Sequence, residues 1–146
     1  MAEDNAVTRA EIVAKKQFDA ASLVMEDDAA AEIEIFDPRT KSGTGIFITV
    51  YSRDSERARA VTRGQLNRRF RNMGRARGAA ALTAEELEAE TMDLLVACTK
   101  SWRGVVWNGN ELALTAEHAR GLYTASPIIR EQVEDAISDR ANFTRR

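Results

Sequence analysis

Two segments near the start of the chain carry the residue pattern of β-strands. In residues 32–37 charged and apolar residues alternate, which directs Ile33 and Ile35 to one face of a strand. Residues 45–51 are mostly β-branched or aromatic, as expected of a more buried strand, and residues 38–44 between them are rich in turn formers. We therefore predict a β-hairpin. Because an isolated hairpin is only marginally stable in water, it needs a further strand, a packed helix or a copy from another subunit.

The spacing of apolar residues becomes helical after the predicted hairpin. Large apolar side chains recur there at intervals of four and three residues, namely Leu66, Phe70 and Met73. Ser52 or Asp54 is placed to cap the start of this helix, and we expect it to end near Gly74. The alanine- and glycine-rich residues 75–82 then predict a flexible linker.

The next segment begins with a helix start signal. Thr83 and Glu86 have the spacing of a capping box, in which each side chain satisfies a backbone amide of the other residue. Apolar residues continue at helical spacing as far as Trp102, so we predict one long helix that ends at Gly104.

Two shorter helices are predicted after an Asn-Gly turn, where we expect Trp107 to fold back over the core. The first helix begins near Thr115. The second has a strong start, because Ser126 can cap it and Pro127 occupies the first helical position, where its missing amide costs nothing. Its inward side is predicted to consist of Ile129, Val133 and Ile137, with Phe143 closing the end.

These elements predict the α+β class. We expect a β-hairpin or small antiparallel sheet with one packed helix, followed by an all-helical C-terminal unit of about three helices. The predicted organisation is a flexible N-terminal arm (1–31), a hairpin-plus-helix unit (32–74), a linker (75–82) and the helical unit (83–146). A chain of 146 residues is long enough to fold without metal or disulfide support.

The inventory of reactive side chains argues against an enzyme. The chain has one histidine, His118, and one cysteine, Cys98, so it lacks both a base beside a nucleophile and the ligands of the usual zinc sites. Cys98 lies in an apolar run, which favours buried packing over a reactive thiol, and His118 is interpreted as a surface residue. There is no glycine-rich phosphate loop. We expect no catalysis, no metal and no cofactor.

Positive charge is concentrated in the first predicted helix. Between residues 53 and 77 the chain has nine arginines and two acidic residues, about +7 in a protein whose net charge is −2. Such a helix can follow a nucleic-acid backbone, but it lacks aromatic stacking residues other than Phe70. A solvated face or contact with an acidic partner is the favoured interpretation. The rest of the chain is correspondingly acidic. Attraction between the basic helix of one copy and the acidic remainder of another also favours head-to-tail association between copies. The predicted basic face comprises Arg57, Arg63, Arg68, Arg69 and Arg71.

The chain shows no targeting or membrane signal. No apolar run approaches the roughly 20 residues of a membrane-spanning helix, and the N-terminus lacks the basic and apolar parts of a signal peptide. We expect a cytoplasmic protein with no membrane contact.

The order of these elements resembles that of the tail assembly chaperones of tailed bacteriophages. In the first half, a strand ends in Asp37-Pro38, and a glycine-containing turn and a second strand precede the helix start at residues 53–56. In the second half, a helix ending in a tryptophan precedes a Trp-Asn-Gly turn, a leucine-rich stretch and a helix that starts at a proline. These residues are Trp102, Trp107-Asn108-Gly109, Leu112 to Leu122, Pro127 to Ile137 and the final Asn142-Phe143 pair. The resemblance covers residues 32–143.

The resemblance implies a protein of the host cell cytoplasm that is absent from the mature virion. It would bind the tape measure protein and keep this long, aggregation-prone helix soluble while tail tube subunits assemble, with the tail tube protein as a further candidate partner. This role requires grooves that cover a partner helix and self-association of the chain. The residues assigned to self-association are Ile33, Ile35, Phe47 and Val50, and those assigned to partner binding are Trp102, Trp107, Leu122 and Tyr123.

Alternatives remain open at this point. For each of these individual residues, ordinary core packing is favoured over contact with a partner. For the whole chain, one alternative is a nucleic-acid-associated regulator that uses the arginine-rich helix, and another is a structural tail or head-completion component that stays in the virion.

Overall fold

A computed structural model of the chain describes residues 17–75 and 82–144. Residues 76–81 of the predicted linker (75–82) and residues 1–16 of the predicted arm (1–31) therefore lie outside the described residues. The strands are β1 (Ala30–Asp37), β2 (Ser42–Tyr51), β3 (Thr99–Arg103), β4 (Val106–Trp107) and β5 (Asn110–Glu111). The helices are α2 (Glu56–Arg75), α3 (Ala84–Cys98), α4 (Ala116–Ala125) and α5 (Pro127–Ser138), with short 3₁₀ turns η1 (Ala20–Leu23) and η2 (Arg140–Asn142).

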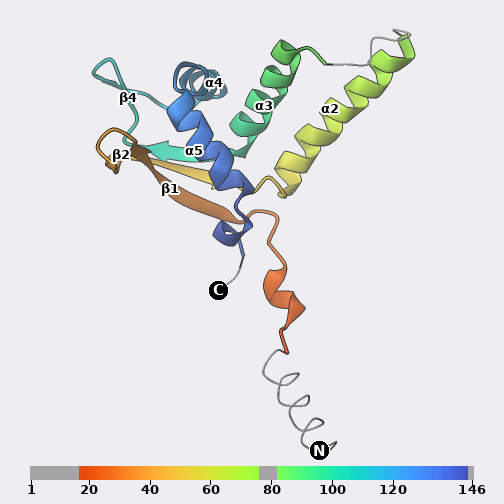
Figure 1. Cartoon of the computed structure of the whole chain (residues 1–146), viewed down its shortest axis with the longest axis horizontal. Helices are drawn as coiled ribbons and strands as arrows, with labels where there is room; N and C mark the ends of the chain where they lie inside the picture. Colours follow the sequence, from red (N-terminus) through yellow and green to blue (C-terminus); the bar gives the residue numbers. More distant parts are fainter. Residues whose placement is uncertain (1–16, 76–81, 145–146) are drawn as a thin grey trace, which may run out of the picture.

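The centre of the fold is an antiparallel sheet in the order β1-β2-β3. The predicted hairpin is present, with Ile33 opposite Ile48 across β1 and β2. On the other side of β2, Ile48 lies opposite Trp102 of β3. Figure 1 shows α5 crossing the sheet beside α4, whereas α3 and α2 extend to one side. The α+β class is confirmed, with an N-terminal sheet and C-terminal helices.

The predicted helix from Thr83 to Trp102 is wrong in its last turn. The helix ends at Cys98, and Thr99 is extended (φ −82°, ψ 113°) and begins strand β3. The physical reason is tertiary. Strand β2 has a second edge free for pairing, and Thr99 takes its place opposite Val50. The third strand that the hairpin requires thus comes from the C-terminal half of the same chain, so the two predicted units share one sheet.

Helix α5 has the predicted start and buried side. The Ser126 side chain accepts a hydrogen bond from the backbone N–H of Ile129, and Pro127 occupies the first turn. Ile129, Val133, Ile137 and Phe143 are buried in one core with residues of the sheet, α3 and α4. Gln132 also fixes α5 to the edge of the sheet, because its amide donates to the carbonyl of Phe36 and accepts from the N–H of Phe36, both at 2.9 Å.

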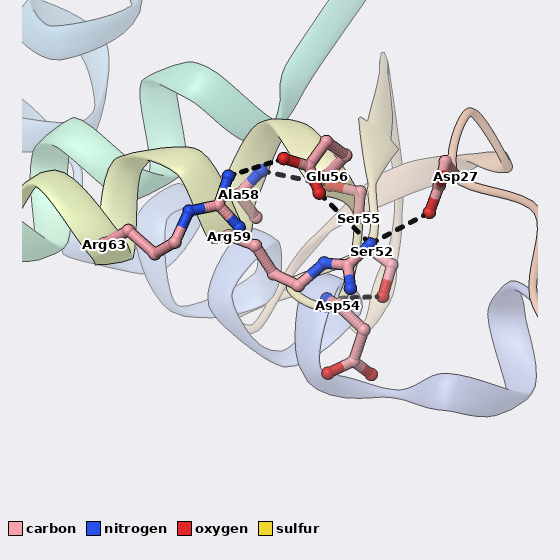
Figure 2. Close-up of polar contacts among 8 residues, drawn as sticks. All are labelled: Asp27, Ser52, Asp54, Ser55, Glu56, Ala58, Arg59 and Arg63. Atoms are coloured by element: carbon pink, nitrogen blue, oxygen red, sulfur yellow. Dashed lines mark hydrogen bonds and ion pairs between the residues drawn. The ribbon is translucent and has the colours of Figure 1, made fainter.

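Helix α2 differs from the prediction at its start. Its cap is Ser55, whose hydroxyl accepts from the N–H of Ala58 at 3.2 Å, while the Ser52 hydroxyl accepts from Asp54 in the preceding turn. Ser55 stands directly before the first helical residue, which is the position that satisfies the open amides of the first turn. Figure 2 shows both contacts at the base of the helix.

The apolar side of α2 is not part of the core. Leu66, Phe70 and Met73 are 46%, 61% and 50% exposed. The helix packs instead on α3 through its other side, where Ala58 and Gln65 are buried. The most pronounced apolar pattern of this helix is therefore only partly covered by the described residues.

The turn after β4 also departs from expectation. Asn108 and Gly109 both have positive φ (49° and 82°), as in the tight two-residue turns that join antiparallel strands. The resulting β4–β5 hairpin extends away from the sheet (Figure 1). Trp107 is 44% exposed on this hairpin, so the prediction that it folds back over the core is wrong. Among the described residues, no helix has the length and apolar character required to cross a membrane.

Candidate partner-binding surfaces

Three of the four residues assigned to partner binding belong to the core or its border. Tyr123 is completely buried, and its hydroxyl lies 2.6 Å from that of Thr99. Leu122 is also buried. Trp102 is partly buried, and its indole N–H donates to the carbonyl of Leu112 at 2.8 Å. These contacts fit the packing alternative and leave Trp107 as the accessible member of the set.

Trp107 stands at the edge of a small cleft between the β4–β5 hairpin and α4. The cleft has a volume of about 350 Å³. Its lining is Trp107, Leu112, Glu117, His118, Gly121 and Leu122. His118 is fixed at this edge, because its backbone N–H donates to the capping Thr115 and its ring Nδ1 lies 2.7 Å from the carbonyl oxygen of Ala113. An apolar cleft with a few polar groups at its border is suited to a single large side chain of a partner.

A second and larger groove runs between α2 and α3. Its volume is about 480 Å³. Leu87, Thr91 and Leu94 line it from α3, and the arginines at its border are Arg53, Arg59, Arg63 and Arg69. The groove therefore combines an apolar wall with a border of arginines, three of which also pair with acids of the same chain: Arg59 and Arg63 with Glu56, and Arg69 with Glu90.

Polar contacts hold the two helices of this groove together. The Gln65 side chain donates to the backbone carbonyl of Glu90 at 2.9 Å, and Arg69 forms an ion pair with the Glu90 carboxylate. A buried amide contact is worth about 1 kcal/mol, far less than a large apolar side chain in a core. We therefore expect α2 to be attached less strongly than α5.

The arginines of the predicted basic face contact different residues of the chain. Arg57 lies over the ring of Tyr51 at 4.7 Å, Arg63 pairs with Glu56, and Arg69 pairs with Glu90. Arg68 and Arg71 form no ion pair with another described residue. Helix α2 is thus not a uniform row of free cations, and only part of its charge is available to an external partner.

The residues assigned to self-association also divide. Ile35 and Val50 are buried in the core of their own chain, and Ile33 packs partly against it. Phe47 is half-buried beneath the guanidinium of Arg103, whose Cζ lies 3.8 Å from the ring centroid. The positions of Ile35 and Val50 fit the packing alternative. Strands β1 and β3 are the two edges of the sheet.

The ionisable side chains of Cys98 and Tyr123 are buried in the core. Burial raises the pKa of the Cys98 thiol to about 11, which disfavours the reactive thiolate. Burial likewise raises the pKa of Tyr123 to about 12, an increase that the hydrogen bond to Thr99 partly opposes. Within residues 17–75 and 82–144, no three His, Cys, Asp or Glu side chains gather where they would hold a metal ion.

Sequence reasoning missed the groove between α2 and α3. The stripe of Leu66, Phe70 and Met73 was recognised, but a pattern of this kind does not say whether the chain itself supplies the covering surface. One available indication was the spacing of Arg59 and Arg63, which continue the same stripe at intervals of four and three residues. A side that begins with arginines and ends with apolar residues is unusual for a core-facing helix.

Comparisons with known proteins gave no match: neither a scan of protein-family models nor searches of curated proteins and of solved structures found one.

Proposed function

We propose that this chain is a tail assembly chaperone of a tailed bacteriophage, which binds the tape measure protein and keeps it soluble while the tail tube assembles. The proposal rests first on the ordered patterns of the sequence, from the Asp37-Pro38 turn to the Asn142-Phe143 pair. It places the protein in the host cell cytoplasm and outside the mature virion.

The exposure of Trp107 is the structural observation that carries the proposal. Tryptophan is an energetically important residue at protein interfaces, and a half-exposed one beside an apolar cleft is suited to a helix that inserts a large side chain. Val106, next to it on the hairpin, is also exposed. We assign the tape measure helix to this cleft.

Co-expression tests the proposal. The chain is produced with the product of a neighbouring gene for a long coiled-coil protein, and the amount of that protein in the soluble fraction and in a pull-down is measured. We expect it to be insoluble alone, and to be soluble and to co-purify with the wild-type chain. If the wild-type chain neither retains nor solubilises it, the proposed function is overturned.

Two variants locate the binding surface. Trp107→Ala should reduce retention at least about tenfold, the effect of losing 1.4 kcal/mol. The matched control is Ile128→Ser, since Ile128 is an exposed apolar residue of α5 that does not line the cleft. If Trp107→Ala retains the partner as well as the control does, the function stands but the cleft is not the binding surface.

A second candidate function is a nucleic-acid-associated regulator, which is favoured by Arg68 and Arg71, since neither forms an ion pair with another described residue. The double variant Arg68→Glu/Arg71→Glu leaves the Arg69–Glu90 pair intact. Salt-dependent retention of DNA or RNA that disappears in this variant would support the regulator. A third candidate, a structural tail or head-completion component, is separated by mass spectrometry of purified particles, because the chaperone should be absent from them.

A further inference from the structure

One continuous stripe runs along the exposed side of α2. Arg59, Arg63, Leu66, Phe70 and Met73 follow each other at intervals of four, three, four and three residues, so they share one side of the helix. The first two line the groove between α2 and α3. The apolar members continue the same side of α2 beyond these arginines, and exposed Leu87 lines the groove from α3. This surface fits a short segment that is both apolar and acidic.

The chain contains such a segment at its own N-terminal end. In residues 17–28 the exposed apolar side chains are Phe18 (68%), Leu23 (63%) and Val24 (64%). The same residues include Asp19, Glu26, Asp27 and Asp28, and they contain no lysine or arginine. We call residues 17–28 the acidic arm. Its apolar and charged groups complement those of the groove.

Residues 17–24 of the acidic arm make little contact with the rest of the described chain, whereas Met25 packs against the core and Asp27 pairs with Arg59. Figure 1 shows it extending from the sheet in the direction opposite to α2 and α3. Within the described part of the chain, the hydrogen bonds of residues 17–25 stay inside the segment and involve Asp19, Ala21, Ser22 and Val24. Large apolar side chains on a projecting segment are exposed to water without a covering surface, which favours docking elsewhere.

One contact already shows the charge pairing between this arm and α2. Asp27, at the base of the arm, lies 3.1 Å from Arg59, which is also 3.3 Å from Glu56 (Figure 2). The arm thus leaves the body beside the basic start of α2 and then turns away from it.

We propose that the acidic arm of one copy docks in the α2–α3 groove of a second copy. Phe18, Leu23 and Val24 cover the apolar stripe of α2, and Asp19 and Asp28 approach the arginines at the groove border. Because the arm and the groove are different surfaces, the contact is head-to-tail, and each copy still has one free arm or one free groove after pairing. Repetition of the contact gives a ring or an open chain of copies.

The inference requires only this chain, so its failure would leave the proposed binding of the tape measure protein untouched. Sedimentation velocity of the full-length chain measures association over a range of concentrations, at low and at high salt. We expect the wild-type chain to associate with increasing concentration, and less so at high salt, because the charges involved are exposed.

Variants on each side of the contact supply the decisive test. An arm variant (Phe18→Ser/Leu23→Ser/Val24→Ser) and a groove variant (Leu66→Ser/Phe70→Ser) should each raise the dissociation constant at least about tenfold. All five positions are exposed, so both variants should keep the circular dichroism spectrum of the wild type. The control Val106→Ser changes an exposed apolar residue on the β4–β5 hairpin and should associate like the wild type.

Mixing the two variants distinguishes this contact from other modes of association. The arm variant retains an intact groove and the groove variant an intact arm, so an equimolar mixture should form a dimer that does not grow further. A wild-type chain that stays monomeric at all concentrations overturns the proposal, including the case in which the arm folds back onto its own groove. Variants that associate as well as the wild type, or a mixture that remains monomeric, also overturn it.

Discussion

Helices α5 and α2 each carry three large apolar side chains along one side, and these side chains have opposite surroundings. Those of α5, Ile129, Val133 and Ile137, are buried against a core to which the sheet, α3 and α4 contribute. Those of α2, Leu66, Phe70 and Met73, are about half exposed, and the helix is attached to α3 through polar contacts. The difference indicates that the core is complete without the apolar side of α2, which remains free for another surface.

The largest expected effect comes from truncating one apolar side chain in each of the two helices and comparing the loss of stability. Ile137→Ala removes a buried side chain of α5 and should lower the free energy of unfolding by about 2–5 kcal/mol, because it leaves a cavity in the core. Phe70→Ala removes a larger side chain from α2 but should cost less than about 1 kcal/mol, since that side chain is exposed. Urea denaturation of both variants provides the measurement. Similar losses for the two would contradict the distinction between the helices.

The next effect tests whether the core around α5 excludes water, by the change in the free energy of unfolding at alkaline pH. Burial raises the pKa of Cys98 from 9.0 to about 11 and that of Tyr123 from 10.0 to about 12. At a pH between the ordinary pKa and the raised pKa of either group, the unfolded chain binds fewer protons than the folded chain. The free energy of unfolding therefore falls as pH rises. The contribution of both groups is complete below about pH 9 and is lost towards about pH 12, on the order of 2 kcal/mol for each group.

Urea denaturation at pH 8 and pH 11 measures this loss. Tyr123→Phe should make the decline shallower, because it removes one of the two titrating groups. Tyr51→Phe, which alters a half-exposed tyrosine of β2, is the matched control and should decline like the wild type. Equal slopes for wild type and Tyr123→Phe would mean that Tyr123 is solvated in the folded chain and that this part of the core is open.

A smaller effect concerns the attachment of α2 itself. Gln65→Ala removes the hydrogen bond to the Glu90 carbonyl and should cost about 1 kcal/mol. Its main consequence should be local, namely faster amide hydrogen exchange in α2 with little change in α5. The control is Gln132→Ala, which releases α5 from Phe36 of β1 instead and should affect the sheet edge. Faster exchange throughout the molecule after Gln65→Ala would show that α2 and the core unfold as one unit.

Most features that depend only on neighbours in sequence were predicted from the sequence, although the cap of α2 is Ser55 and not Ser52 or Asp54. The caps at Thr83 and Ser126 and the first-turn Pro127 are examples, since each acts on amides within three residues. The hairpin of β1 and β2 belongs to the same group. Strand β3 was not predicted, because Thr99 is extended only through its pairing with Val50, which is far away in the sequence.

In the candidate sites, too, features that depend on contacts distant in the sequence were not predicted. The exposure of Trp107 depends on how the Asn108-Gly109 turn directs its hairpin, and the burial of Tyr123 depends on contacts with α3 and Thr99. A hydrophobic residue looks the same in sequence whether its covering surface is internal or belongs to another molecule. This is why the stripe on α2 could be recognised from its spacing, while its exposure could not.

The smallest expected effect concerns an ion pair that connects the C-terminal segment to the start of α2. Arg140, the first residue of η2, donates to Asp54, before α2, at 2.7 and 3.3 Å, and this contact holds the pKa of the Asp54 carboxyl below its ordinary value. The stabilisation is therefore present at neutral pH and lost as acid protonates Asp54. Arg140→Ala should cost less than about 1 kcal/mol, and less again in 1 M salt, because the pair is partly exposed.

Urea denaturation at pH 7 and at pH 3 measures the contribution of this pair. The control Arg39→Ala disrupts an ion pair with Asp37 inside the β1–β2 turn and should leave α2 unaffected. A loss above about 2 kcal/mol for Arg140→Ala would exceed the range of exposed ion pairs. In that case the C-terminal segment would secure the start of α2 to the core, and the helix would not be the loosely attached element that its exposed stripe indicates.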